Sequence, residues 1–412
     1  MIKASVNDIT ANGLCIGCGL CESLAGKDQL ELVMTPEGRE RPLVKTELSN
    51  GVLHNILQTC PGTQIHGLPE PEITPDTTVD EIWGPVIQID RGYAADPDIR
   101  FRGSTGGVLT ALAIYLLESG RVDFVAHVAA DPKRPMRTKP HLSFTKEDVL
   151  KAAGSRYGPA APLKHFLQLL DRRQPFAFIA KPCDVTAVRN LARRDERVNE
   201  YCRYLLTLVC GGASELSKSQ FVIEDFQLEE DELSLFRYRG FGNPGKTRIE
   251  TKDGRAFELT YNDLWEDEGK WQIQYRCKIC ADAIGEAADI AASDVWPGGG
   301  PVGEDAGFNG VLARTQRGAE LVKAAVRDGY LVLDQSLTPR EMDAFQPHQV
   351  RKKQAVWARL EALKQAGKPI PNVVGLRIEE LYEQNPAEEN QKEIEGTLRR
   401  INQGQFDEPV PR

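Results

Sequence analysis

Three cysteines near the start of the sequence, Cys15, Cys18 and Cys21, are separated from one another by two residues. One tight loop with this spacing can point three sulfurs at a single object, and cysteine thiolates are the ligands of iron–sulfur clusters. A bacterial ferredoxin run ends in a fourth cysteine followed by proline, and Cys60-Pro61 is the nearest such pair. The pattern therefore predicts a [4Fe–4S] cluster bound by these three cysteines and Cys60. Zinc is the alternative, although it is usually held by two separated Cys-x-x-Cys pairs.

A second group of cysteines is predicted from the later part of the chain. Cys277 and Cys280 form a Cys-x-x-Cys pair that needs two more thiolates, and Cys183 and Cys210 each follow a predicted buried strand. Ligands collect beyond the carboxyl ends of the strands in an open α/β sheet. We assign these four cysteines to a second [4Fe–4S] cluster and leave Cys202 free. The alternative is that Cys183 and Cys210 are ordinary buried cysteines.

A glycine-rich turn, Gly103-Ser-Thr-Gly-Gly107, stands between a predicted strand and an apolar helix. Backbone N–H groups of a turn at a helix N-terminus suit a cofactor phosphate. The turn is not a P-loop, because no Gly-Lys-Ser/Thr follows it. The alternative is a tight connector without a ligand. A second polar loop, Gly154–Gly158, precedes another predicted helix.

Alternating strand and helix signals surround these residues. Residues 85–90, 108–119 and 122–128 predict a strand, a helix and a strand, which together resemble a βαβ unit. Gly240-Phe-Gly-Asn-Pro-Gly245 matches a dinucleotide motif, but a strand pattern follows it, so we predict a flexible loop and then a hairpin. Further strands are predicted at 175–180, 204–209, 290–295 and 310–314, and helices at 315–328 and 350–365.

The predicted fold class is α/β, with a mixed sheet flanked by helices, an N-terminal ferredoxin-like iron–sulfur module and a helical C-terminal tail. A proline-rich connector follows the module. The expected organisation is a module at 1–70, a first α/β part at 84–170, a second part with the second cluster and a substrate crevice at 171–345, and a helical, partly disordered tail at 346–412.

Composition narrows the function classes. The net charge of −9 disfavours nucleic acid as a partner, and the 412 residues include no apolar run long enough to span a membrane. Nine cysteines without a signal peptide indicate a cytoplasmic metalloprotein rather than a disulfide framework. Two basic clusters are either solvated faces or docking sites for an acidic electron donor: Arg189, Arg193, Arg194 and Arg197, and Arg351, Lys352 and Lys353.

The region from about Gly84 to Asp328 resembles the coenzyme F420 hydrogenase/dehydrogenase beta-subunit family. The N-terminal cysteine module is similar to the branch that contains 7-hydroxymethyl chlorophyll a reductase and the iron–sulfur divinyl chlorophyllide vinyl reductase. Thr105 departs from the family pattern, in which a second serine is common. The resemblance is carried by Gly103–Leu112, Lys181-Pro-Cys183-Asp184, Phe236–Gly240, Cys277-Lys-Ile-Cys280 and Ser293–Trp296.

The resemblance implies FAD beside two iron–sulfur clusters, with ferredoxin as donor and a small organic substrate that receives a hydride. A homo-oligomer is also expected. Tyr157, His165, Asp184 and Asp294 are candidates to supply the proton, although each has a structural role as its alternative. The residues expected to bind FAD are Gly103, Ser104, Thr105, Gly106, Gly107, Ser155, Arg156, Tyr157 and Lys181.

Three functions follow from these residues. The first is a ferredoxin-dependent reductase that contains its own active site. The second is an electron-transfer beta subunit of a larger oxidoreductase that uses a deazaflavin, coenzyme F420, or another carrier. The third is a zinc-stabilised binding module without redox chemistry.

Overall fold

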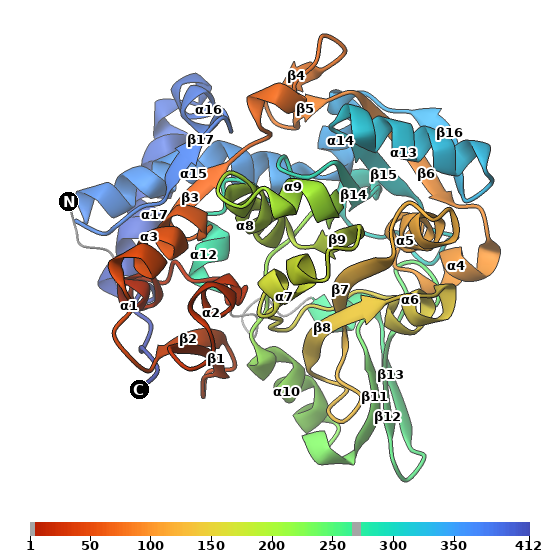
Figure 1. The fold of residues 1–412 in the computed structure, drawn as a ribbon, viewed down its shortest axis with the longest axis horizontal. Helices are drawn as coiled ribbons and strands as arrows, with labels where there is room; N and C mark the ends of the chain where they lie inside the picture. The colour runs from red at the N-terminus through yellow and green to blue at the C-terminus, as the bar shows by residue number, and fades with distance from the viewer. Residues whose placement is uncertain (1–4, 266–272) are drawn as a thin grey trace.

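The computed structural model describes residues 5–265 and 273–412, and a mixed sheet of eight strands lies at its centre (Figure 1). Strands from both predicted α/β parts alternate within it, so 84–170 and 171–345 build one sheet together. The strand order is β16-β6-β15-β14-β10-β9-β7-β8. Their bounds are β6 (Gln88–Ala94), β7 (Phe124–Ala130), β8 (Thr138–Ser143), β9 (Phe176–Ala180), β10 (Cys202–Leu208), β14 (Ile290–Asp294), β15 (Asn309–Ala313) and β16 (Leu331–Ser336).

Helices cover both faces of this sheet because its central strands are apolar on both sides. Along β7, Val125 belongs to the core formed with α5 (Val108–Glu118) and α13 (Gln316–Arg327). Its neighbours Phe124 and Ala126 point the other way, toward α7 (Phe166–Asp171) and α8 (Pro182–Ala192). This alternation is the period of two expected for a strand.

The predicted βαβ unit is only partly correct. The strand before the glycine-rich turn is β6 and the strand after α5 is β7, but β15, β14, β10 and β9 lie between them. In contrast, β9, β10 and β14 are neighbours and run parallel. Their carboxyl ends therefore meet at one edge of the sheet, as the sequence predicts for the segments that carry Cys183 and Cys210.

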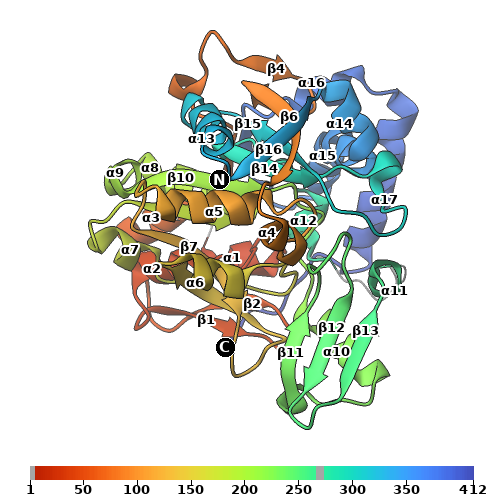
Figure 2. The ribbon, with the colours of Figure 1, turned by 90° about the vertical axis from the view of Figure 1, so that its right-hand side faces the viewer.

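A smaller antiparallel sheet projects from the main body (Figure 2). It consists of β11 (Leu233–Arg237), β12 (Thr247–Thr251) and β13 (Ala256–Leu259), and it packs with α10 (Leu216–Asp225). The predicted hairpin is confirmed, since β12 and β13 pair on either side of Asp253-Gly254. The loop that carries Arg239 connects β11 to β12.

The N-terminal module is packed against the main body rather than held by a free linker. Its helix α2 contacts α7, and its helix α3 contacts α8. The module consists of α1 (Val6–Ala11), α2 (Leu20–Ala25), β1 (Leu30–Met34), β2 (Glu40–Val44), α3 (Asn50–Thr59) and β3 (Gln64–His66). The remaining elements before the tail include β4 (Thr78–Asp80), β5 (Gly84–Val86), α4 (Pro97–Arg102), α6 (Lys146–Ala152), α9 (Arg197–Tyr201), α11 (Tyr261–Trp265), α12 (Tyr275–Lys278) and α14 (Pro339–Phe345).

The expectation of a partly disordered tail is wrong. The polar composition hides a pattern of small and apolar residues that lets α17 (Ala387–Asn402) pack on α15 (Pro347–Gln365). Strand β17 (Asn372–Val374) pairs in parallel with β3 of the module, and α16 (Ile378–Gln384) follows it. The C-terminal segment therefore lies beside the N-terminal module (Figure 1).

A buried ion pair closes this contact. The Glu408 carboxylate accepts hydrogen bonds from Arg41 Nε at 2.6 Å and Nη2 at 3.0 Å, and Arg39 Nη1 lies 3.0 Å from it. The Glu408 N–H donates to the Ala11 carbonyl at 3.2 Å. Phe406, which is also buried, lies against Gly13, where an added Cβ would come within 2.7 Å of the Phe406 carbonyl oxygen. In the part of the chain described here, no helix is both long enough and apolar enough to cross a bilayer.

We predict that Glu408→Gln lowers the free energy of unfolding by about 3–5 kcal/mol, because it leaves Arg41 as a buried charge without its partner. Urea unfolding measures the change. The matched control is Glu388→Gln in the exposed Glu388–Lys392 pair, which should cost less than about 1 kcal/mol. Equal effects of the two substitutions would contradict the importance of the buried pair.

Candidate functional site

The structure brings the four cysteines of the predicted first cluster together. Cys21 is an electrostatic neighbour of both Cys15 and Cys60, and Cys18 is a neighbour of Cys21 and Cys60. Cys21 lies on α2, whereas Cys60 caps the C-terminus of α3. Two helices of the module therefore hold the four sulfurs around one position.

The surroundings of these sulfurs suit thiolates. The Gly17 N–H donates to Cys15 Sγ at 3.4 Å, and the Gly62 N–H donates to Cys60 Sγ at 3.3 Å. Burial raises the pKa of every thiol in the group, that of Cys60 to about 12. Buried thiols of this kind become thiolates when a bound cation compensates their charge.

The four cysteines of the predicted second cluster converge in the same way. Cys183 lies in the first turn of α8 and is a neighbour of Cys210 and Cys280, while Cys210 is also a neighbour of Cys277. The Ala213 N–H donates to Cys277 Sγ at 3.3 Å. Cys202 lies apart, buried at the start of β10 beside Asp289.

The donor sets fit iron–sulfur clusters better than single ions. Each consists of four cysteines and no other ligand type, which is the usual set for a [4Fe–4S] cluster. Among the residues described, no group of three or more His, Cys, Asp or Glu side chains is arranged to hold one metal ion. A zinc site would instead place its sulfurs about 2.3 Å from one ion.

A buried ion pair stands between the two cysteine groups. Lys181 Nζ lies 2.7 Å from Asp184 Oδ2, and Asp184 is an electrostatic neighbour of both Cys18 and Cys183. Lys181 in turn is a neighbour of Cys183 and Cys210. Burial raises the pKa of the Asp184 carboxyl, and Lys181 opposes this shift. The pair therefore connects the two groups electrostatically.

A polar cluster, which we call the Arg239 group, lies beyond the carboxyl end of β14. It consists of Thr105, Tyr157, Arg239 and Asp294. The buried Arg239 guanidinium lies 3.3 Å from Asp294 Oδ2 and donates to Thr105 Oγ1 at 3.1 Å and to the Tyr157 hydroxyl at 3.4 Å. Thr105 Oγ1 also donates to Asp294. The guanidinium lies 4.9 Å from the centre of the Trp296 ring, so the group presents a fixed charge beside aromatic rings.

The two predicted cofactor loops meet beside this group. Ser155 Oγ on the loop 154–158 donates to Ser104 Oγ on the turn 103–107 at 2.9 Å. The expectation of unhindered N–H groups in the turn is wrong at Val108, whose N–H donates to Asn309 Oδ1 at 3.2 Å. Gly106 is packed so tightly that an added Cβ would lie 2.8 Å from that same atom. A substitution at Gly106 therefore tests packing rather than phosphate binding.

Two predicted site residues lie outside the Arg239 group. The Arg156 guanidinium donates to the backbone carbonyls of Pro135, Met136, Arg137 and Phe236, which makes it a clamp between loops. His165 is exposed at the N-terminus of α7, near the module. Of the four proton-donor candidates, only Tyr157 and Asp294 are brought together.

Most of the predicted docking charges are consumed inside the protein. Arg189 is buried and pairs with Asp289 at 2.8 Å, and Arg197 pairs with Asp195 at 2.7 Å. In the second cluster, Lys353 is buried against Glu286, and Lys352 donates to the Gly211 carbonyl at 3.0 Å. The prediction that either whole cluster forms a docking surface is therefore wrong.

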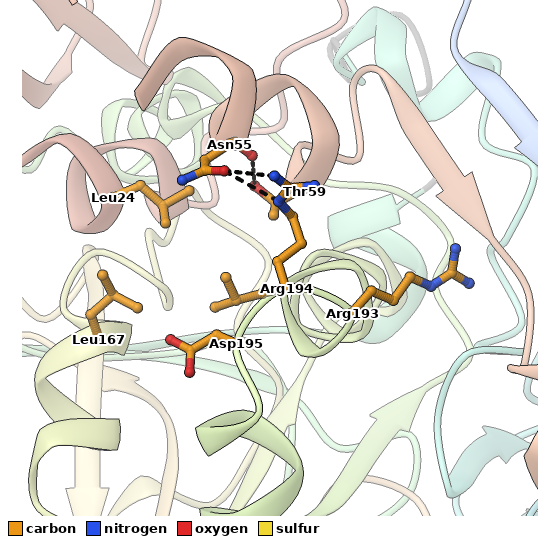
Figure 3. Close-up of a pocket in the computed structure, with 8 residues that line it drawn as sticks. Leu24, Asn55, Thr59, Leu167, Arg193, Arg194 and Asp195 are labelled. Atoms are coloured by element: carbon orange, nitrogen blue, oxygen red, sulfur yellow. Dashed lines mark hydrogen bonds between the residues drawn. The ribbon is translucent and has the colours of Figure 1, made fainter. Parts of the chain in front are cut away.

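Arg193 and Arg194 are the exceptions, because they line a surface cavity of about 530 Å³ (Figure 3). Arg194 donates to Asn55 Oδ1 at 2.9 Å. Leu24 and Thr59 line the same cavity, and they stand close in sequence to Cys21 and Cys60. The cavity therefore adjoins the first cysteine group.

Arg239 and Asn309 are site residues that the sequence did not single out. Arg239 lies in the Phe236–Gly240 segment that carries the family resemblance, which was the available signal. Asn309 begins β15, and only the packing of β15 beside the glycine-rich turn gives its side chain a role.

Comparison with known proteins identifies the family. Residues 90–168 match the description "Coenzyme F420 hydrogenase/dehydrogenase, beta subunit N-term", and residues 174–337 match its companion description, which ends in "C terminus" instead. The two segments together span more than half of the chain. The chain therefore belongs to the coenzyme F420 hydrogenase/dehydrogenase beta-subunit family, as the motifs predicted. Its place in the chlorophyll-reductase branch stays a prediction.

Two curated relatives and one solved structure illustrate the range of the family. The beta subunit of F420-dependent formate dehydrogenase 1 from Methanococcus maripaludis is 34% identical over 58% of this chain and 59% of its own length. The coenzyme F420-dependent sulfite reductase of Methanocaldococcus jannaschii is 24% identical over 79% of this chain and 48% of its own length. This chain thus matches only about half to three fifths of these relatives. A chain of the F420-reducing [NiFe] hydrogenase complex from Methanosarcina barkeri shares the fold, with a TM-score of 0.54, 22% identity and coverage of 72% of this chain and 98% of that one.

We predict that Asp294→Asn destabilises the protein by about 3 kcal/mol, because it leaves the buried Arg239 without its charged partner. Urea unfolding of the variant measures the loss. Glu258→Gln is the control, since Glu258 pairs with Lys246 and Arg248 at the surface and should contribute less than about 1 kcal/mol. An Asp294→Asn effect no larger than the control would show that Arg239 does not depend on this carboxylate.

Proposed function

We propose that this chain is the electron-transfer beta subunit of a larger oxidoreductase, binds two [4Fe–4S] clusters and FAD, and exchanges electrons with a deazaflavin. The observation that carries the proposal is the convergence of eight cysteines into two groups of four, joined by the Lys181–Asp184 pair. The family membership and the names of the relatives, which are subunits or enzymes of F420-dependent oxidoreductases, support it. This is the second of the functions expected from the sequence, and it is favoured over a reductase that works alone.

Iron–sulfur clusters supply one-electron transfer, and a flavin links one-electron and two-electron chemistry. The chain's own residues would hold these groups in stated ways. The eight cysteines would supply thiolate ligands, and the N–H groups of Gly17, Gly62 and Ala213 would stabilise sulfur charge by hydrogen bonding. Lys181 would offset part of the negative charge between the groups.

The Arg239 group would orient the flavin. Its guanidinium is held in place by Asp294, and Trp296 and Tyr261 lie beside it. Two orphaned polar atoms near this place, Trp296 Nε1 and Ser293 Oγ, are buried without hydrogen-bond partners among the described residues. Such atoms suit a polar cofactor edge, because a buried donor without a partner is costly.

The cysteine assignment predicts roughly eight irons per chain in anaerobically purified protein, from two four-iron clusters. Cys18→Ser should remove about half of this iron, since it takes one ligand from the first group. Cys202→Ser should leave the iron content unchanged and serves as the matched control. About four irons in the wild-type protein, or a colourless zinc protein, would contradict the assignment.

The deazaflavin proposal predicts that reduced coenzyme F420 bleaches the flavin and cluster absorption of the isolated chain, and that the chain co-purifies with a catalytic subunit. A ferredoxin is tested in parallel, because Arg193 and Arg194 beside the first cysteine group favour an acidic donor as the second candidate. Rapid reduction by ferredoxin, weakened by Arg194→Glu, without any reaction with F420, would support the self-contained reductase instead.

A further inference from the structure

A second surface cavity, of about 420 Å³, lies on the loop between β11 and β12. Ligand pockets range from about 300 to 1,000 Å³, so this cavity is large enough for part of a cofactor but small for a whole dinucleotide. None of the predicted site residues lines it. Its walls are Phe101, Arg237, Phe241, Lys246, Arg248, Glu258 and Glu304.

Two aromatic rings in this cavity are exposed to solvent. Phe101 is 52% exposed and Phe241 is 43% exposed, and their ring centres lie 5.5 Å apart at an interplanar angle of 72°. Phe241 has a φ of +60°, which is unfavourable for a bulky residue and occurs chiefly where function or packing requires it. The ring pair offers an uncovered apolar surface against which a flat heterocycle can stack.

Cations surround this aromatic surface. The Arg237 guanidinium lies 4.0 Å from the centre of the Phe241 ring, and its Nε is buried without a hydrogen-bond partner among the described residues. Lys246 and Arg248 share Glu258 at 3.1 Å and 2.9 Å. These pairs are solvent-exposed and therefore weak, so both cations can turn toward an incoming anion. Three cations and two carboxylates line the cavity, which leaves it positive.

The cavity adjoins the Arg239 group. Phe236 and Tyr238 point into the core beneath the small sheet, so Arg237 and Arg239 lie on the opposite face. Two extended residues span about 7 Å. The Gly242 N–H donates to the Phe101 carbonyl at 3.0 Å, which fixes this loop against the end of α4, directly before the glycine-rich turn.

We propose that this cavity binds a nucleoside diphosphate. The base lies against Phe241 and Phe101, and the phosphates lie against Arg237, Lys246 and Arg248. The inference rests on the proposed function for one of its two sources, because the ADP half of FAD would lie here while its flavin reaches the Arg239 group. A free nucleotide is the other source.

Isothermal titration with ADP tests the proposal on the full chain, both loaded with flavin and stripped of it. ADP should bind the stripped protein. Exclusion of ADP from the flavin-loaded protein identifies the ADP half of FAD, whereas ADP binding to both forms identifies a separate nucleotide site. Failure of ADP to bind the stripped protein overturns the proposal.

Phe241→Ala and Arg237→Gln should each weaken ADP binding to the stripped protein about tenfold, which corresponds to about 1.4 kcal/mol. Phe144→Ala is the matched control, because Phe144 is 49% exposed at a distant position before α6 and should leave ADP affinity unchanged. Iron content and the urea midpoint of each variant establish that it is folded. Unchanged ADP affinity in both folded cavity variants overturns the inference, while iron content and F420 exchange test the proposed function separately.

Discussion

The Lys181–Asp184 pair occupies the position on which the arrangement of the whole site depends. Asp184 is fully buried next to cysteines of both groups, and a buried carboxylate is tolerated only with a compensating charge. The pair forms because Lys181 ends β9 and Asp184 begins α8 within the same turn. The packing of α2 and α3 onto α7 and α8 then brings the N-terminal cysteines to it.

The two ends of the chain cooperate to hold that module in place. Glu408 meets Arg41 across 367 residues of sequence, and β17 adds a strand beside β3. Because Arg41 and Glu408 are electrostatic neighbours of Cys15, the C-terminal segment also shapes the surroundings of the first cysteine group. The module is therefore part of one rigid arrangement of cysteines, which suits electron transfer over fixed distances.

The internal use of basic residues separates the two redox functions expected from the sequence. A self-contained reductase that relies on an acidic donor needs a broad basic face, yet Arg189, Arg197 and Lys353 serve as buried or paired cations. Within the two predicted basic clusters, the small cavity at Arg193 and Arg194 retains this character. A subunit that meets its partner over a larger, mixed surface has no such need.

The sequence by itself determined the features that depend on near neighbours. The Cys-x-x-Cys spacings, the period-two strands and the Thr338–Glu341 capping box all act within a few residues, and the structure forms each of them. The pairing of cysteines into two groups was also predictable, because parallel strands must end at the same edge of a sheet.

Only the tertiary structure decided which distant residues meet. Arg239 reaches Thr105 and Asp294 from positions 134 and 55 residues away, and no local pattern encodes such a contact. The same is true of the ordered tail, whose polar surface concealed the small and apolar residues that pack on α15. Charge has the same limit, since a sequence shows how many cations a segment holds, but burial and partner geometry decide which of them remain available to a ligand.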